Sequence, residues 1–423
     1  MIEAILERFP VAPDVAAAAR SAYARTPDRA ARINSRVRTA MLAAFQAQGL
    51  ADADLWGTFG YGYDDAARDA YEALLARVLG AERALARLSL VSGTHAIVTA
   101  IAACVAPGER LVVATGRPYD TLRSALVDAP YSLAARGIEV AEVPLDAAGA
   151  PDAETIAAAC SAGCAAVFVQ RSRGYAPRRS LAARECGAIA GAVKSVAPRT
   201  AVLVDNCYGE LVEEHEPTAF GADLVMGSLI KNLGGGLAPG GGYVAGRADL
   251  VDRVAAHHYA PGLGAAVGPT LGFARAFVQG LFLAPMVVGE ALAGLDFVAA
   301  LFAELGYRVD PGPGSERVDI VQAIRLGDAG RLLAFARGLQ TAMPLNARFR
   351  PEPGAVPGYA EPVVMSAGAF VSGATIELSC DAPLREPFEV YVQGGTFREH
   401  VALGAIRAAD AMARADVLRP AKS

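Results

Sequence analysis

The sequence predicts an α/β protein with a large doubly wound, mostly parallel sheet and a smaller C-terminal α+β domain. Between about residues 88 and 246, short runs that are apolar throughout alternate with helical segments, as in parallel sheets covered on both faces. The 423 residues are enough for two domains. Hydrophobic residues make up 53% of the chain and charged residues 20%, which is typical of a well-packed globular protein.

The expected elements follow in chain order. Residues 1–50 have helical spacing without a strand pattern, so we expect an N-terminal helical arm. A large domain over 51–265 begins with the Gly/aromatic loop WGTFGYGYDD and an amphipathic helix, and its expected strands are LVSG, RLVVAT, IEVAEVPL, AAVFVQ, AVLVDN, LVMGS and GGYVAG. A smaller domain over 266–423 has a long helical segment, then strands at ELGYRVDP, IVQAIRLG and ATIELS.

Composition excludes several classes of protein. The formal net charge of -5 argues against a nucleic-acid binder, which would present a basic face. The N-terminus has early acids and no signal-peptide pattern, and charged residues and Pro285 interrupt the most apolar stretch. We therefore expect a cytoplasmic protein with no membrane partner. The six cysteines are scattered and form no Cys-x-x-Cys pair, which disfavours zinc and a disulfide framework.

Polar residues at the ends of the expected strands are the candidate site, because ligands of open α/β sheets bind there. Ser92, Gly93 and Thr94 open a helix whose free N–H groups favour an anion, although an ordinary N-cap is an equal reading. Arg171 and Arg173 directly follow a buried strand. An anionic ligand would explain them, and a salt-bridged surface loop is the alternative.

Asp205 and Lys231 end two successive expected strands. Asp205 could cap the next turn, hold a metal or pair with a cationic nitrogen. The segment VEEHEP (212–217) is the only nearby set of metal ligands and is interpreted as a solvated loop, so no metal is expected. Lys231 has apolar neighbours, which predicts a lowered pKa and a nucleophilic amine, whereas alone it would be a surface lysine.

Together, an anion site, an acid and a buried amine match the needs of pyridoxal 5′-phosphate (PLP). The phosphate would take the helix N-terminus, the acid would keep the pyridine nitrogen protonated, and the amine would form the Schiff base.

The chain resembles fold-type I PLP enzymes of the Cys/Met-metabolism group, and most closely the methionine γ-lyase-like family often labelled aluminium-resistance protein. The resemblance covers about residues 50 to 400, and its motifs are GYGYDDAARD, LVSGTHAI, VQRSRGY, VDNCYGELVEEHEP, GSLIKNLGGGLAPGGGYVAGR and IELSCDAPLREPFEVYVQGG.

The resemblance implies roles for individual residues. Lys231 would be the Schiff-base lysine and Asp205 the partner of the pyridine nitrogen. The phosphate would be held by Ser92, Gly93, Thr94 and Ser228. Tyr119, 26 residues beyond Gly93, would stack on the cofactor ring and move protons at the leaving group, with His95 as the rival stacking residue.

The resemblance also implies shared active sites. Tyr61 or Tyr63 would contact the phosphate of a neighbouring subunit, in a homodimer or a homotetramer; their alternative is an aromatic loop packed on its own subunit. Arg385 is the first choice for binding the substrate carboxylate, because a guanidinium binds it in bidentate fashion, and Arg173 is the competing choice.

The function implied is a PLP-dependent lyase that eliminates a γ or β leaving group, such as a thiolate or halide, from a small amino-acid substrate. A PLP-dependent aminotransferase, aldolase or γ-replacement transferase is the alternative, and a non-enzymatic scaffold is a third reading. The chain departs from the γ-lyase pattern at Asp120, Leu233 and Ala382, which leaves the identity of the substrate open.

Overall fold

The computed structural model describes residues 1–26, 30–357 and 359–420. The chain forms two compact units: a large unit, Arg36–Pro285, and a small unit made of Met1–Ser35 and Met286–Ser423. These boundaries differ from those expected. Instead of forming a separate arm, the N-terminal helices α1 (Ile2–Arg8) and α2 (Pro13–Arg25) pack against α12 (Arg398–Arg414). Such a long-range contact leaves no local sequence pattern.

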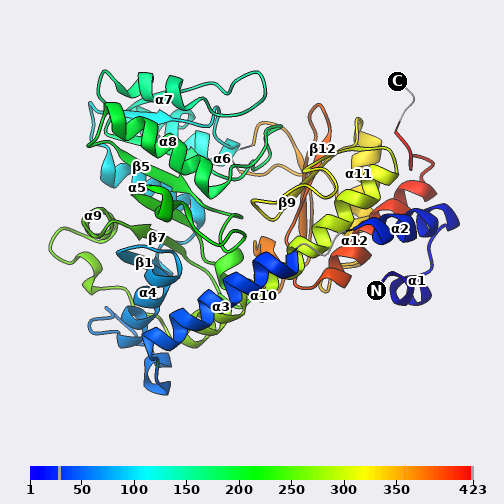
Figure 1. Ribbon diagram of the computed structural model, residues 1–423, viewed down its shortest axis with the longest axis horizontal. Helices are drawn as coiled ribbons and strands as arrows, with labels where there is room; N and C mark the ends of the chain where they lie inside the picture. The colour runs from blue at the N-terminus through cyan, green and yellow to red at the C-terminus, as the bar shows by residue number, and fades with distance from the viewer. Residues whose placement is uncertain (27–29, 358, 421–423) are drawn as a thin grey trace. The chain divides into compact units, whose positions relative to one another are not determined.

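The large unit contains a seven-stranded sheet of order β1-β7-β6-β5-β4-β2-β3 (Figure 1). Strands β6, β5, β4, β2 and β3 are parallel, whereas β7 runs antiparallel to both of its neighbours. The strands are β1 Arg83–Arg87, β2 Arg110–Val113, β3 Glu139–Glu142, β4 Ala166–Gln170, β5 Ala201–Asp205, β6 Leu224–Ser228 and β7 Gly242–Gly246.

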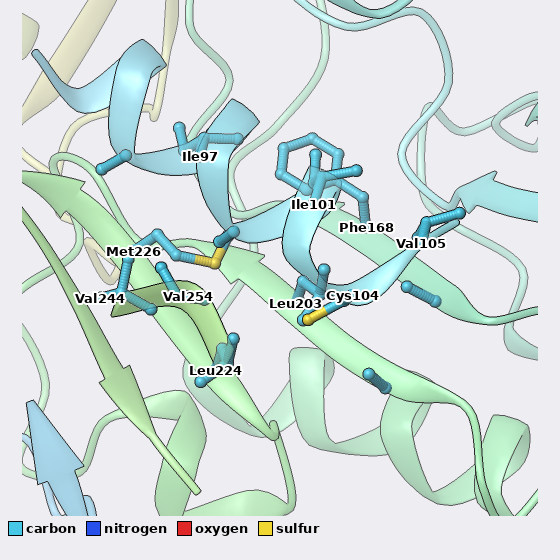
Figure 2. Packing of buried hydrophobic residues seen from close by; sticks show 14 of the residues in the cluster. Ile97, Ile101, Cys104, Val105, Phe168, Leu203, Leu224, Met226, Val244 and Val254 are labelled. Atoms are coloured by element: carbon cyan, nitrogen blue, oxygen red, sulfur yellow. The ribbon is translucent and has the colours of Figure 1, made fainter. Parts of the chain in front are cut away.

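Helices of this unit pack on the sheet through apolar side chains. Helix α5 (Gly93–Cys104) contacts α9 (Ala248–His258) and strands β5, β6 and β7. Figure 2 shows Ile97 and Ile101 of α5 packed with Phe168, Leu203 and Met226 of the strands. Each such side chain contributes roughly 1.5–3 kcal/mol when fully buried. Other helices of this unit are α4 Ala66–Val78, α6 Asp120–Arg123, α7 Ala153–Cys160 and α8 Ala183–Val196, and α3 Ala30–Gln48 begins in the small unit and continues into this one.

The small unit has a five-stranded antiparallel sheet of order β10-β11-β12-β9-β8. Helices α11 (Ala329–Gln340) and α12 pack against each other, and α11 also contacts β10 and β11. The strands are β8 Arg308–Asp310, β9 Val321–Arg325, β10 Val363–Ala367, β11 Ser379–Pro383 and β12 Glu389–Gln393. The large mostly parallel sheet and the smaller second sheet confirm the predicted architecture.

Helix α10 (Ala274–Glu304) is the apolar segment noted in the sequence. Among the described residues it alone is long and apolar enough to cross a membrane by length and composition. However, 72% of its apolar window is buried inside the protein, which is typical of the core helix predicted for this segment.

Two expected strands are wrong. Residues 90–93 form the turn into α5, because Ser92 caps that helix, and the edge strand β1 lies earlier in the chain. In ATIELS, Thr375–Glu377 is a 3-10 turn, and Leu378 adopts a φ of 61° that a strand cannot accommodate. The strand β11 starts only at Ser379.

Candidate active site

The N-terminus of α5 forms the predicted anion site. Ser92 is the N-cap: its Oγ accepts the N–H of His95 at 3.1 Å, and its carbonyl accepts the N–H of Ala96 at 3.0 Å. Helix geometry provides no intrahelical acceptor for the N–H groups of Gly93 and Thr94. These two amides and the helix dipole favour a bound anion.

Three segments meet tightly at Gly93. A Cβ added there would lie 3.2 Å from Ser228 Cβ and 3.4 Å from Cys207 Sγ. Ser228 ends β6, and Cys207 lies just beyond the end of β5. The carboxyl ends of β5 and β6 and the start of α5 therefore approach closely, and a residue larger than glycine at position 93 would force its neighbours to shift.

Asp205 is the last residue of β5 and is 4% exposed. Its Oδ1 accepts the N–H of Cys207 at 3.1 Å. Burial raises the pKa of Asp205, against the opposing effects of Lys231 and of Cys207. A buried carboxylate of this kind needs a cationic partner.

Lys231 follows β6, and its Nζ lies 3.9 Å from the centroid of the Tyr208 ring. Burial acts to lower the pKa of Lys231, but the acidic groups of Cys207, Tyr208, Asp205 and Tyr119 outweigh burial and raise it well above its ordinary value. The prediction that the apolar neighbours of Lys231 lower its pKa is therefore wrong for the chain alone. Residues from other segments place acidic groups around the amine.

Tyr119 is partly buried and lies close to the same group of residues. Its hydroxyl lies 3.1 Å from Thr94 Oγ1, and its N–H donates to Gln170 Oε1 at 3.3 Å. Burial, and then Asp205 and Cys207, raise the pKa of Tyr119 well above its ordinary value. The phenol is therefore protonated at neutral pH and is available as a proton donor.

His95 belongs to a different cluster. Its Nδ1 accepts the N–H of Val91 at 3.3 Å, and its ring centroid lies 5.5 Å from that of His258. The acidic groups that influence Lys231 include Tyr119. The structure thus brings Tyr119 to Asp205 and Lys231, whereas the contacts of His95 run toward the end of α9.

Arg171 was predicted to bind substrate, and its contacts in the structure do not support that role. Its side chain is 0% exposed, pairs with Glu213 and Glu216, and donates to Asn206 Oδ1 at 2.6 Å. An arginine so enclosed holds the 206–216 segment in place and cannot contact a substrate. The solvated loop expected at VEEHEP is likewise wrong for Glu216, which is buried with Arg171. No cluster of three or more metal-ligating side chains occurs in the described part of the chain.

The other predicted substrate and partner residues are found in both units. Arg173 is buried after β4, and its N–H donates to Ser180 Oγ at 2.9 Å. Arg385 belongs to the small unit and pairs with Glu361 at 3.3 Å. Tyr61 and Tyr63 are 79% and 54% exposed, so neither is packed into its own subunit.

Residues beyond Asp205 form a support that the sequence reasoning missed. Asn232 Nδ2 donates to the carbonyls of Tyr208 at 3.0 Å and Glu210 at 2.8 Å, which ties the lysine segment to the segment after β5. Tyr243 donates to Glu210 Oε1 at 2.9 Å, and burial raises the pKa of Glu210 to about 8. In the sequence, only the position of Tyr208 and Glu210 soon after Asp205, at the end of a strand, could have indicated this support.

The sequence model of the methionine gamma-lyase family matches residues 14–413. The chain belongs to the methionine gamma-lyase family. It is similar to a carbon-sulfur lyase involved in aluminum resistance from Clostridium novyi, with 35% identity, a TM-score of 0.91, and coverage of 96% of this chain and 98% of that one. It is also 39% identical over 384 residues to YnbB of Bacillus subtilis, described as uncharacterized, covering 90% of this chain and 91% of the relative.

More distant structures establish the fold of this family member. A pyridoxal-5′-phosphate dependent protein of Escherichia coli has 17% identity and a TM-score of 0.58, and covers 91% of this chain and 97% of that one. The apo methionine gamma lyase of Micromonospora echinospora has 18% identity and a TM-score of 0.56, covering 89% and 98%. The predicted fold type I is confirmed.

Proposed function

We propose that this family member is a PLP-dependent lyase that removes a γ or β leaving group, such as a thiolate, from a small amino acid. The observation that carries the proposal is the convergence of Lys231, Asp205 and Tyr119, which influence one another's pKa values beside the N-terminus of α5. Family membership and the printed description of the Clostridium novyi relative as a carbon-sulfur lyase support it.

The residues present fit PLP. The amides of Gly93 and Thr94 and the hydroxyl of Ser228 would hold the phosphate, and the close approach at Gly93 leaves no room for a side chain there. Asp205 would pair with the pyridine nitrogen, which supplies the cation that this buried carboxylate needs. Lys231 is the amine for covalent attachment. When bound, the cofactor would act as an electron sink for negative charge developing at the substrate Cα.

The side chains divide the proton transfers. Lys231 Nζ would take the proton from the substrate Cα. For this step the raised pKa of Lys231 must first fall, which would happen when a bound ligand pairs with the acidic groups around the amine. Tyr119, which retains its proton at neutral pH, would donate it to the departing sulfur. Arg385 and Arg173 remain the predicted partners of the substrate carboxylate.

The test is an absorbance spectrum of purified protein supplied with PLP, followed by assays for 2-keto acid and ammonia from a panel of γ- and β-substituted amino acids. Lys231→Ala should lose the absorbance of covalently attached cofactor and lower keto-acid release by roughly 10²–10⁴-fold, as expected for loss of an acid–base group. Unchanged absorbance and turnover in this variant would remove Lys231 from the mechanism. Stoichiometric conversion of the cofactor to its amine form by an amino donor, with no released ammonia, would favour the aminotransferase.

We also propose that the enzyme is a homodimer, or a tetramer of dimers, formed through an aromatic loop surface. This surface consists of Trp56, Phe59 and Tyr61, which are 74%, 73% and 79% exposed, and of Phe273, whose loop is hydrogen-bonded to theirs through Leu271 N–H and the carbonyl of Thr58. Such large exposed aromatic side chains are typical of interfaces. A second copy of the chain is the occupant that the family resemblance implies.

A further inference from the structure

Two of the six cysteines form a pair remote from the candidate active site. Cys160 is the last residue of α7, and Cys164 lies two residues before β4. The proposed catalytic residues lie beyond the carboxyl ends of the strands, whereas this pair lies at the amino end of β4. The proposed lyase chemistry leaves both thiols unused.

A tight turn joins the two cysteines: the N–H of Gly163 donates to the carbonyl of Cys160 at 2.9 Å, and each thiol has the largest influence on the pKa of the other. Cys160 is fully buried, while Cys164 is partly exposed. Cys164 Sγ also lies 3.5 Å from Thr200 Oγ1, and the adjoining Ala165 N–H donates to the carbonyl of Arg110 at 2.9 Å. The partly exposed sulfur of Cys164 therefore lies beside the hydroxyl of Thr200 and close in the chain to a second thiol.

The turn that joins the two cysteines can adjust. Residues 161–163 are exposed, and Gly163 has a φ of 98° with no other residue within 4 Å of an added Cβ. Only this short turn must move to bring the sulfurs to the disulfide bond length of about 2.05 Å. Fully buried Cys160 stays in place while Cys164 approaches it.

We propose that Cys160 and Cys164 are a peroxide-reactive thiol pair, in which Cys164 is the attacking thiolate and Cys160 the resolving thiol. Cys164 sulfur attacks one oxygen of a hydroperoxide, the O–O bond breaks, and a sulfenic acid and one water or alcohol result. Cys160 sulfur then attacks the sulfenic sulfur, its proton leaves with the hydroxyl as water, and a disulfide forms. Two thiols are oxidised and one peroxide is reduced.

The pKa values of the thiols agree with the assignment of Cys164 as the attacking group. The hydrogen bond from Cys160, opposed by burial and aided by Thr200 and Arg110, lowers the pKa of Cys164 to about 7. Burial instead raises the pKa of Cys104 to about 11 and of Cys186 to about 12. Since the thiolate is the reactive form, peroxide should select Cys164.

The experiment treats the full-length, cofactor-loaded protein with equimolar hydrogen peroxide at pH 7 and maps its peptides by mass spectrometry. We expect one intrachain disulfide joining Cys160 and Cys164, reversible by dithiothreitol. Cys160→Ser should instead leave a sulfenic acid at Cys164 that dimedone traps, and Cys164→Ser should leave Cys160 unoxidised. Two persisting thiols in the wild type, or oxidation that occurs first at another cysteine, would overturn the proposal.

A second measurement does not depend on the disulfide. The rate of alkylation of Cys164 by iodoacetamide should be half-maximal near pH 7. At that pH Cys164 would carry more than about tenfold as much thiolate as an ordinary cysteine with a pKa of about 8.5. Cys186→Ser is the control, since Cys186 is buried and should not alter either readout. A midpoint at the ordinary value would contradict the role of Cys164 as attacking thiolate.

Discussion

At the scale of single residues, charge in this protein is set by side chains distant in sequence. The position of Lys231 beyond a strand could be predicted from its apolar flanks, but the direction of its pKa could not, because Cys207, Tyr208, Asp205 and Tyr119 come from other segments. The same limit applies to Arg171. Its place after β4 suggested a ligand, and only the fold shows Glu213 and Glu216 around it.

Replacing Arg171 by methionine should therefore affect stability before it affects substrate binding. The change leaves the buried Glu216 and the less buried Glu213 without their cation, and loss of one partner of a buried ion pair costs roughly 3–5 kcal/mol. Urea denaturation measures this loss. The matched control is Arg179→Met, because the side chains of Arg179 and its partner Glu185 are 44% and 39% exposed, so that this change should cost under about 1 kcal/mol. Equal midpoints for the two variants would contradict a structural role for Arg171.

At the scale of elements, the parallel strands that carry the site were predictable, whereas β1, β10 and β12 were not expected and β11 was placed too early. The runs around β2, β4, β5 and β6 are apolar throughout, so their ends could be assigned to one edge of a sheet. Strand β1 has the sequence RALAR and lies at the sheet edge, where a pattern so short does not stand out. The close approach at Gly93 was also invisible, since it depends on where Ser228 and Cys207 lie in space.

Gly93→Ala should weaken cofactor binding without unfolding the protein. Its Cβ would come within 3.2 Å of Ser228, which must shift by a few tenths of an ångström in the proposed phosphate site. We expect roughly a tenfold rise in the Kd for PLP, about 1.4 kcal/mol, measured by absorbance titration. Gly191→Ala on α8 is the control, because nothing lies within 4 Å of its Cβ and the helix should gain about 0.4–1 kcal/mol. Unaltered PLP affinity in Gly93→Ala would contradict the assignment.

Asp65 should make the aromatic loop surface sensitive to acid. Its Oδ2 accepts from the N–H and the hydroxyl of both Thr58 and Thr270, which ties together the two loops that carry the exposed aromatic residues. Burial opposes ionisation, but hydrogen bonds from Thr270, Arg68 and Thr58 outweigh it and lower the pKa of Asp65 to about 2.

Because this pKa lies below the unfolded value of about 3.9, the stabilisation is complete above about pH 5 and is lost progressively as the pH falls through 3.9 toward 2. Asp65→Asn does not titrate, so the gap in urea midpoint between wild type and variant should narrow from pH 6 to pH 3.5. A constant gap over this range would show that the carboxylate is not the titrating group.

At the scale of the whole molecule, assembly should control cofactor retention. The double change Phe59→Ser and Tyr61→Asp places polar groups in the aromatic loop surface. In one copy of the chain Phe59 is 73% and Tyr61 is 79% exposed. We expect sedimentation to shift toward the monomer and PLP affinity to fall, if Tyr61 reaches the phosphate of a second copy. Tyr131→Ser is the control, since Tyr131 is also exposed but lies outside these loops. A dimer that survives the double change would place the interface elsewhere.

The packing of α1 and α2 against α12 has a consequence for how the chain is made. Ala12 donates its N–H to Asp410 Oδ1 at 2.8 Å, so the segment of α1 and α2 finds this partner only after a further 398 positions have been synthesised. The large unit is continuous and can form meanwhile, whereas the apolar sides of the two leading helices must wait in solvent. A nascent chain stalled before α12 should for that reason recruit chaperones at α1 and α2.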